Sequence, residues 1–407
     1  MPTIVKREAY LDMIRPYMGQ PLIKVITGIR RCGKSTMFSQ IMTELSETGV
    51  PDERIIRIDF DNMDNNSLRD GAALHGLIVG RMSGEGMHYV FIDEIQEVSG
   101  WERVANSLLS RGNIDLYISG SNSRLLSSEL ATYITGRYVS LEIQTLSFRE
   151  YIDFRKTFAN DGSEDRRKAL DGYIRRGGFP LANISDYDDA SADRIVRDIF
   201  ESVFFRDTID RNRIRNRVQI ENLVKFMFDN IGNPFSVDSI RREFSRHGMP
   251  IDAATAASHL RAMEGSYLIR RVSRYNIRGK KVIMSDDKYY VADVSLIYSL
   301  MGFKNSMMSG IEENIVLLEL VRRGYGVYVG RTKSGKEVDF VAERDGRKIY
   351  VQVTHTMHDE AVAERELSAL KDIGDNYPKY VVTMDKVWSE DVDGIKLVSL
   401  ADFLLEE

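Results

Sequence analysis

The stretch LIKVITGIRRCGKST, residues 22–36, decides how the first part of this chain folds. Its first six residues (22–27) are mostly apolar and predict a buried strand. The run STMFSQIMTELSE (35–47), which begins at the end of the stretch, has the periodicity of an amphipathic helix. Between them, Gly28–Ser35 match the pattern G-x-x-x-x-G-K-[ST]. Glycines allow such a loop to wrap an anion, so that backbone N–H groups and the helix amino terminus face it. The stretch therefore predicts a strand–loop–helix unit that binds phosphate groups.

Each residue type in this loop has a place in nucleotide chemistry. The Lys34 ammonium is expected to reach the β- and γ-phosphates, and the Ser35 hydroxyl is expected to complete the coordination shell of Mg²⁺. The predicted nucleotide-binding residues are Gly28, Ile29, Arg30, Arg31, Cys32, Gly33, Lys34, Ser35 and Thr36.

A second motif, YVFIDE (89–94), is an apolar strand that ends in two acids. Asp93 is predicted to hold Mg²⁺ or its water, and Glu94 is predicted to polarise an attacking water as a general base. The alternative is a solvated acidic turn after a core strand. Together with the phosphate loop, the pair favours a hydrolase over a small-molecule kinase.

Polar residues also follow the strand at 115–120, where the ligands of open α/β sheets bind. Ser121 or Asn122 is a candidate to sense the γ-phosphate or to position water, and a plain strand-to-helix cap is the alternative. Arg137, in the segment Thr135-Gly136-Arg137, is a candidate phosphate clamp in its own chain or in a neighbouring one. The alternative for Arg137 is an ordinary surface arginine.

Apolar strands alternate with helical stretches over the first 150 residues, which indicates a parallel sheet covered on both faces. The strands are expected at 22–27, 54–60, 88–93, 115–120 and 138–143. Helical periodicity dominates to about residue 300, and a mixed pattern then resumes. We therefore predict three domains: 1–150, a P-loop NTPase core; 151–304, a helical lid with a winged-helix-like module; and 305–407, a small α/β domain resembling a restriction nuclease.

Composition excludes several classes of protein. The chain has 407 residues, of which 43% are hydrophobic and 29% charged, as in an ordinary globular protein. One cysteine, Cys32, excludes an internal disulfide framework, and six scattered histidines make a zinc site unexpected. No apolar run approaches the roughly 20 residues that span a bilayer, and the first residues, MPTIVKREAY, lack a signal-peptide core. We expect a cytoplasmic protein without a membrane partner.

The motifs GIRRCGKST, FIDEIQ, ISGSNS, TGRY, LSFREY, RRGGFP and EVDF together resemble a prokaryotic family of ATPases. Its members join an AAA-type ATPase domain to a carboxy-terminal region of undefined function, and the resemblance extends over nearly the whole chain. It implies an AAA+-like sheet with strand order 5-1-4-3-2 and ATP as the nucleotide. It implies no cellular role.

A basic segment follows the helical region. Residues 239–281 contain ten Lys or Arg and three Asp or Glu, a balance of +7 in a chain whose net charge is −5. The segment reads as helix, turn, helix and hairpin, which is typical of a winged helix that binds duplex DNA. The candidate contacts are Arg261 on the second helix and Arg274, Arg278, Lys280 and Lys281 on the hairpin. The alternative is a lid or a protein-docking module.

The tail carries an incomplete nuclease motif. Glu313 on a helix and Asp339 in EVDF (337–340) match acids of restriction-nuclease-like sites, but Gln352 replaces the second acid and Thr354 the lysine. We interpret Glu313, Asp339 and Gln352 as a degenerate site.

Three functions remain open from the sequence. The first is an ATPase that couples nucleotide state to DNA binding, the second a nucleotide-switched protein-docking or signalling ATPase, and the third an ATP-dependent nuclease with an unorthodox tail site. Self-association is compatible with each of them.

Overall fold

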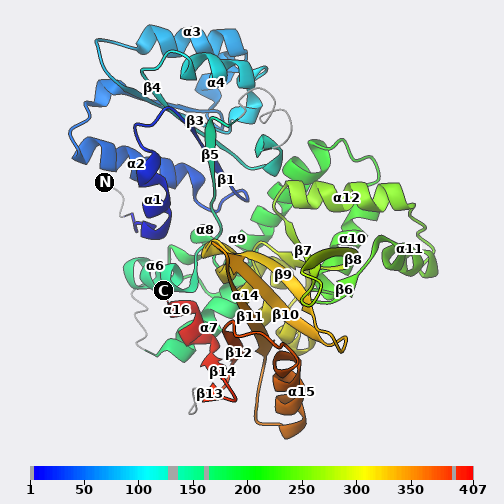
Figure 1. Ribbon diagram of the computed structural model, residues 1–407. Coiled ribbons are helices and arrows are strands. Elements are labelled where there is room, and N and C mark those ends of the chain that lie inside the picture. The colour runs from blue at the N-terminus through cyan, green and yellow to red at the C-terminus, as the bar shows by residue number, and fades with distance from the viewer. Residues whose placement is uncertain (1–3, 127–135, 160–164, 387–390, 407) are drawn as a thin grey trace. The chain divides into compact units, whose positions relative to one another are not determined.

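The computed structural model describes residues 4–126, 136–159, 165–386 and 391–406, which form two compact units. The first unit is Met1–Gln144 with Gly265–Tyr267, and the second is Thr145–Glu264 with Leu268–Glu407. Figure 1 labels the helices and strands of both.

The first unit is built on a five-stranded parallel sheet in the order β2-β3-β4-β1-β5. Its strands are β1 (Ile23–Thr27), β2 (Ile55–Asp59), β3 (His88–Asp93), β4 (Ile114–Gly120) and β5 (Tyr138–Glu142). Its helices are α1 (Glu8–Ile14), α2 (Lys34–Glu47), α3 (Gly71–Arg81) and α4 (Trp101–Leu109). Read from β5, the order is 5-1-4-3-2, so the predicted AAA+-like α/β core is confirmed.

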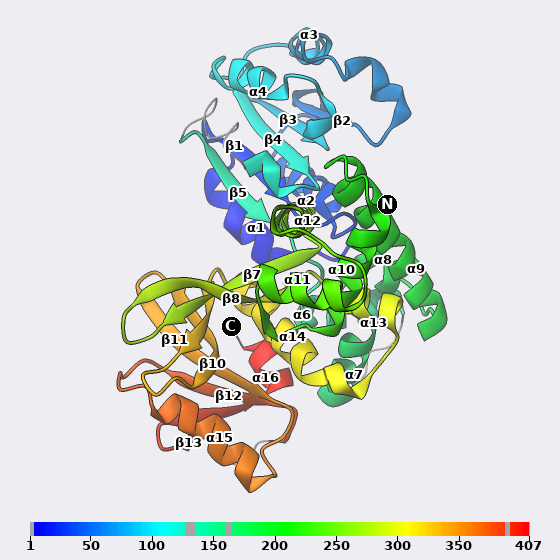
Figure 2. The same ribbon diagram turned by 90° about the vertical axis from the view of Figure 1, so that its right-hand side faces the viewer.

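Helices cover both faces of this sheet, as the continuous apolar strands require. On β3, Val90 and Ile92 face a core that includes Leu74 of α3 and Leu108 of α4. The residue between them, Phe91, packs on the other face against Phe38 of α2, with ring centroids 5.3 Å apart. Figure 2 shows α3 and α4 on one side of the sheet and α2 on the other.

The register of the strands positions the predicted site. Thr27 at the end of β1 pairs with Gly120 at the end of β4, and β3 runs parallel on the far side of β4. The residues that follow these strands, Gly28, Glu94 and Ser121, therefore leave the sheet at one edge.

The second unit begins with helices and ends with a mixed α/β region. Its helices are α6 (Phe148–Phe158), α7 (Arg166–Arg176), α8 (Pro180–Asn183), α9 (Asp189–Ser202), a π-helix (Val203–Asp210), α10 (Arg217–Asp229), α11 (Val237–Arg246), α12 (Ala253–Gly265), α13 (Ser295–Met301), α14 (Met308–Arg322), α15 (Glu360–Lys371) and α16 (Leu400–Leu405). Its strands are β6 (Pro234–Phe235), β7 (Ile269–Asn276), β8 (Lys281–Val291), β9 (Gly326–Arg331), β10 (Glu337–Arg344), β11 (Arg347–Thr354), β12 (Lys379–Thr383), β13 (Asp391–Val392) and β14 (Ile395–Ser399).

All these strands join one sheet in the order β13-β14-β12-β11-β10-β9-β7-β8-β6. The connection that matters most is the parallel pairing of β7 with β9, in which Arg274 lies opposite Val329 and Asn276 opposite Arg331. The β7–β8 hairpin is therefore part of the tail's sheet, and its Tyr275 packs in the tail core with Val341 and Leu370. The predicted boundary at residue 304 falls between α13 and α14, but the sheet continues across it.

Candidate nucleotide site

The loop between β1 and α2 has a backbone that only its glycines can easily adopt. Gly28 has φ +144° and Gly33 has φ +108°, both in the region that favours glycine. A Cβ atom on Gly28 would lie 2.1 Å from the carbonyl oxygen of Ile143, so the loop passes too close to the end of β5 for any side chain. Arg31 also has a positive φ, of 69°. These values fit a loop whose N–H groups turn toward a common centre.

The Lys34 ammonium is buried within this loop. It donates to the carbonyl oxygens of Gly28, at 3.1 Å, and Ile29, at 3.3 Å, and it lies 3.8 Å from Glu94 Oε1. Ser35 and Thr36, the next residues of α2, are exposed. The lysine is therefore held in place by the loop, while the two hydroxyl side chains that follow it are open to solvent.

Asp93, at the end of β3, is buried. Burial raises the pKa of its carboxyl group, and hydrogen bonds from Ser119 and Ser35 partly offset this rise. Ser119 donates to Oδ1, whereas Oδ2 has no hydrogen-bond partner among the described residues. A buried carboxylate oxygen without a partner, close to a serine hydroxyl, fits Mg²⁺, which prefers oxygen ligands.

Glu94 has a left-handed backbone, with φ +56° and ψ +48°, which is strained for a residue other than glycine. Its Oε2 accepts hydrogen bonds from Gln96 Nε2 and, at 3.1 Å, from Ser121 Oγ. Burial alone would raise the pKa of Glu94, but the charges of Lys34 and Arg30, together with these hydrogen bonds, lower it overall. The side chain is therefore an ionised carboxylate held beside the loop.

Arg7 is a residue of this site that the sequence motifs did not indicate. Its guanidinium is buried and donates to the carbonyl oxygens of Cys32, at 3.0 Å, and Gln144, at 3.0 Å. It thus joins the phosphate loop to the last residue of the first unit. No motif around the phosphate loop includes Arg7, because a whole helix and a strand separate this residue from the loop in the sequence.

The other predicted residues of this unit lie at two edges of the sheet. Asn122 is buried directly after β4 at the edge that carries the loop, and Arg30 lies 3.7 Å from Asp61 Oδ2. Arg137 precedes β5 and pairs with the amino-terminal end of β1, about 16 Å of strand away from the loop. Its guanidinium donates to Asn106 Oδ1 at 2.8 Å. Arg137 therefore cannot reach phosphates bound by its own chain, and Thr135 lies outside the described residues.

The predicted DNA contacts divide into two groups. Arg261 on α12 and Arg278, Lys280 and Lys281 at the hairpin turn are exposed. Arg274 is mostly covered and forms an ion pair of 3.2 Å with Glu337. We therefore remove Arg274 from the predicted DNA contacts, because Glu337 already neutralises its charge within the protein.

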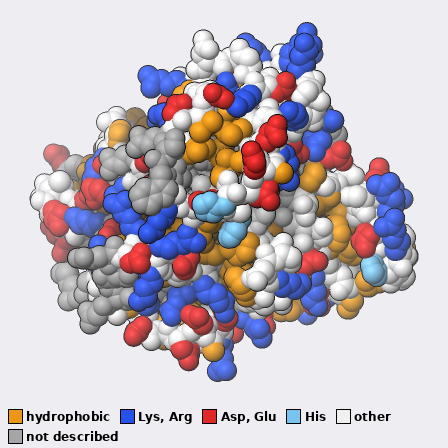
Figure 3. All heavy atoms as spheres, turned by 90° about the horizontal axis from the view of Figure 1, so that it is seen from below, with side chains coloured by type: hydrophobic (Ala, Val, Ile, Leu, Met, Phe, Trp, Pro, Cys, Tyr) orange, Lys and Arg blue, Asp and Glu red, His pale blue; other side chains and the backbone are white. Residues whose placement is uncertain are grey.

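The predicted tail residues do come together. Asp339 N donates to Gln352 Oε1 at 3.3 Å, and Lys288 Nζ lies between Glu313 Oε2 and Asp339 Oδ1, at 3.0 and 3.5 Å. Nearby, His355 Nδ1 lies 2.7 Å from Glu312 Oε1 while the histidine stays exposed. Figure 3 shows histidine side chains at the surface among acidic and basic ones. No group of three metal-ligating side chains occurs in the part of the chain that the structure describes.

The family of AAA domains matches residues 20–152, and two families of domains of unknown function match residues 167–307 (DUF8612) and 309–403 (DUF4143). With the confirmed sheet order, the first match defines an AAA-type P-loop ATPase fold, and this fold implies nucleotide binding. Across the described ranges, no helix has the length and apolarity needed to cross a bilayer.

Two relatives match most of the chain. A protein of Haemophilus influenzae named "Uncharacterized protein" is 32% identical over 404 residues, with 99% of each chain covered. Uncharacterized protein MJ1544 of Methanocaldococcus jannaschii is 30% identical over 362 residues, which cover 85% of this chain and 77% of that one. The chain thus belongs to the prokaryotic family that joins an AAA-type ATPase domain to carboxy-terminal domains of unknown function, as its motifs indicated.

Among solved structures, the Aeropyrum pernix ORC1 protein in complex with DNA is similar at 14% identity, with a TM-score of 0.35. The alignment covers 74% of this chain and 93% of that one. A likeness this distant carries no argument about function.

Proposed function

We propose that the protein binds ATP with Mg²⁺ at the β1–α2 loop and hydrolyses it. The observation that carries this proposal is the convergence of Lys34, Asp93 and Glu94 at one edge of the sheet, each of them buried.

The proposed mechanism assigns one role to each side chain. Lys34 exchanges the carbonyl oxygens of Gly28 and Ile29 for the β- and γ-phosphates, to which it brings a positive charge. Ser35 Oγ and Asp93 Oδ2 would hold Mg²⁺, and the bound ion would supply positive charge beside the phosphates. Glu94 accepts a proton from the attacking water once its carboxylate is released from Gln96 and Ser121. Asn122, at the end of β4, is placed to orient that water or the γ-phosphate.

The test is release of phosphate from ATP by the full-length chain, with Mg²⁺ and with a chelator. We expect turnover in Mg²⁺ only. Tight ATP binding without turnover under every condition would reject the hydrolysis step and leave a nucleotide-dependent switch.

We also propose that α10, β6, α11, α12 and the β7–β8 hairpin form a winged-helix-like module that binds duplex DNA. The element order supports this, because β6 pairs with the hairpin strand β8 as in a small closing sheet. The exposed cations on α12 and at the hairpin turn support it as well, since winged helices direct the second helix and the wing toward DNA.

A gel-shift titration on duplex DNA over a range of salt concentrations, with and without ATP, tests this second part. Phosphate contacts give a steep loss of affinity with salt. Absence of any shift at low salt would reject DNA binding by the protein.

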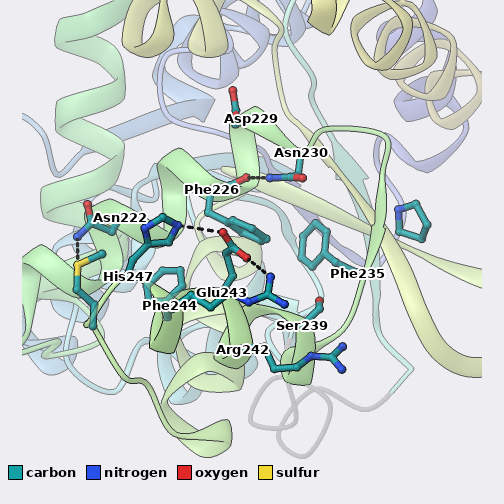
Figure 4. A pocket seen from close by; sticks show the side chains of 13 residues that line it. Asn222, Phe226, Asp229, Asn230, Phe235, Ser239, Arg242, Glu243, Phe244 and His247 are labelled. Carbon is teal, nitrogen blue, oxygen red and sulfur yellow. Dashed lines mark hydrogen bonds and ion pairs between the residues drawn. The ribbon is translucent and has the colours of Figure 1, made fainter.

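The alternative, docking of a protein partner, is favoured by a pocket of about 720 Å³ on α10 and α11. Figure 4 shows Phe226, Phe235 and Phe244 in this pocket beside Glu243, which binds His247 at 3.0 Å. Apolar rings bordered by charged groups are typical of protein interfaces. A protein that binds ATP but no DNA would make this the preferred function.

A further inference from the structure

The carboxylates of the tail surround an ammonium group that belongs to the hairpin. Lys288 Nζ lies 3.0 Å from Glu313 Oε2, 3.0 Å from Glu337 Oε1 and 3.5 Å from Asp339 Oδ1. An ammonium has three N–H donors, and here three carboxylates are available to accept them. The position that a cation would take between these acids is therefore filled by the chain itself.

The two innermost acids also accept hydrogen bonds from groups other than Lys288. Glu313 Oε2 accepts a second hydrogen bond, from Tyr290 Oη at 2.8 Å. Asp339 Oδ2 accepts one from the backbone N–H of Val353 at 2.9 Å. A divalent ion that took Glu313 Oε2 and Asp339 Oδ2 as ligands would have to displace these donors as well as Lys288.

Gln352, which stands in the place of the second nuclease acid, is not available to a metal ion either. The Gln352 side chain donates to Glu366 Oε2 at 2.6 Å and accepts from Asp339 N at 3.3 Å. Both ends of this amide are committed to the protein, so it offers neither a negative charge nor a free oxygen to a metal.

Burial separates this cluster from any large substrate. The side chains of Lys288, Asp339 and Glu313 are 3%, 8% and 10% exposed. A nuclease must bring a phosphodiester of a nucleic acid to its metal ions, which requires an open face. Only Glu337, at 38%, is substantially exposed.

The cations of the cluster come from the hairpin and the acids from the tail. Lys288 lies on β8 and Arg274, which binds Glu337 at 3.2 Å, lies on β7. Glu313 lies on α14, and Glu337 and Asp339 lie on β10. The ion pairs therefore tie both strands of the hairpin to the tail, in addition to the pairing of β7 with β9.

We propose that the tail carboxylates form a cation site permanently occupied by Lys288, so that the tail anchors the hairpin and does not cleave nucleic acid. This inference goes beyond the proposed function and is independent of ATP hydrolysis and DNA binding. It also gives the nuclease-like fold of the tail a structural task, which is to fix the orientation of the basic hairpin.

Electrostatics agree with this geometry. Burial lowers the pKa of Lys288, but the charges of Glu313, Asp339 and Glu337 outweigh burial and keep the ammonium protonated. Burial and the charge of Glu313 raise the pKa of Asp339, and the charge of Lys288 opposes this rise. Removing the ammonium would take away the positive charge that opposes this rise, so the buried acids would take up protons or bind another cation in its place.

The experiment measures thermal unfolding of the full-length chain with and without Mn²⁺, in the absence of nucleotide. The variants are Lys288→Met, Lys288→Met with Asp339→Asn, and Asp339→Asn alone. Lys281→Met, at the exposed hairpin turn, is the matched control. We expect Lys288→Met to unfold at a lower temperature and to regain about 5 °C in saturating Mn²⁺. The gain in unfolding temperature should disappear in the double variant. In Mn²⁺, the wild type and Lys281→Met should gain no more than Asp339→Asn does.

A second measurement keeps the inference testable if Lys288→Met does not fold. Supercoiled plasmid is incubated with the wild type and with Asp339→Asn in Mn²⁺, and nicking is followed. Equal, background nicking by both proteins supports the inference. Nicking by the wild type that Asp339→Asn abolishes would overturn it, as would a Mn²⁺ gain in the wild type that Asp339→Asn removes.

Discussion

Lys34 is bound to the carbonyl oxygens of its own loop, at positions from which it can turn toward a phosphate. Replacing it with alanine removes a buried positive charge that no neighbouring group supplies in the same place. We expect Lys34→Ala to weaken ATP binding about a hundredfold, the upper range for one hydrogen bond to a charged group. Isothermal titration with ATP and Mg²⁺ measures the change, and Lys225→Ala on the exposed surface of α10 is the control. Unchanged ATP affinity of a folded Lys34→Ala protein would remove the proposed site.

A substitution at Glu94 should distinguish ATP binding from ATP hydrolysis. Glutamine keeps the size of the side chain and its capacity to accept hydrogen bonds from Gln96 and Ser121, but it cannot take a proton from water. We therefore expect Glu94→Gln to bind ATP as the wild type does and to hydrolyse it roughly 10²–10⁴ times more slowly. Single-turnover hydrolysis measures the loss, with Glu53→Gln on the surface as control. Turnover at the wild-type rate would move the role of general base to another group, such as Asp93.

The positions of these two residues could be predicted because short motifs carry their own geometry. A strand, a glycine loop and a helix place Lys34, and a strand end places Asp93 and Glu94, without information from the rest of the chain. Lys288 could not be placed in this way. The segment KYYVAD (288–293) looks like a core strand, and the acids that balance Lys288 lie 25–51 residues further along the chain. A buried charge is stable only beside groups of opposite charge, and the tertiary fold determines which groups those are.

At the level of elements, the phosphate loop depends on its close approach to the end of β5. A methyl group on Gly28 would meet the Ile143 carbonyl oxygen at 2.1 Å, in a backbone conformation already unfavourable for alanine. We expect Gly28→Ala to destabilise the first unit by about 2 kcal/mol or more and to weaken ATP binding through displacement of the loop. Calorimetric unfolding with and without ATP measures both effects.

Gly76→Ala is the matched control for this change. Gly76 lies within α3 with no atom near its Cβ position, so alanine there should be neutral or stabilise the helix by up to about 1 kcal/mol. A Gly28→Ala protein as stable and as active as Gly76→Ala would show that the loop can move away from β5 without cost.

Most elements could be predicted from periodicity because buried parallel strands are continuous apolar runs between helices. The strand predicted at 88–93 is β3, with the same limits, and the strand predicted at 22–27 is β1, Ile23–Thr27. The pairing of β7 with β9 could not be predicted, since apolar alternation shows which residues are buried but not which strand lies alongside. For this reason the sequence indicated separate modules where the structure has one sheet.

For the whole molecule, the central question is whether the anchored hairpin connects DNA to ATP hydrolysis. Its turn presents Arg278, Lys280 and Lys281 to solvent, and none of the ion pairs found among the described residues involves them. Its two strands, in contrast, are held by the tail through Arg274 and Lys288. Charges at the turn can therefore be changed without disturbing the ion pairs that hold the strands.

We expect simultaneous replacement of Arg278, Lys280 and Lys281 by glutamate to weaken binding to all DNA sequences about equally. The slope of log affinity against log salt should fall by about one for each lost phosphate contact, hence by up to about three. ATP affinity should not change, because these residues lie outside the phosphate loop. Any stimulation of hydrolysis by DNA should disappear, since DNA can shift the enzyme between states only through a difference in affinity for them.

The control replaces exposed cations on α6, α7 and α9, namely Lys156, Lys168 and Arg194, by glutamate. If both triple variants lost the same salt slope, the attraction would come from overall charge and the hairpin would not be the contact surface. If the hairpin variant kept full DNA affinity, the module would be assigned to protein docking instead.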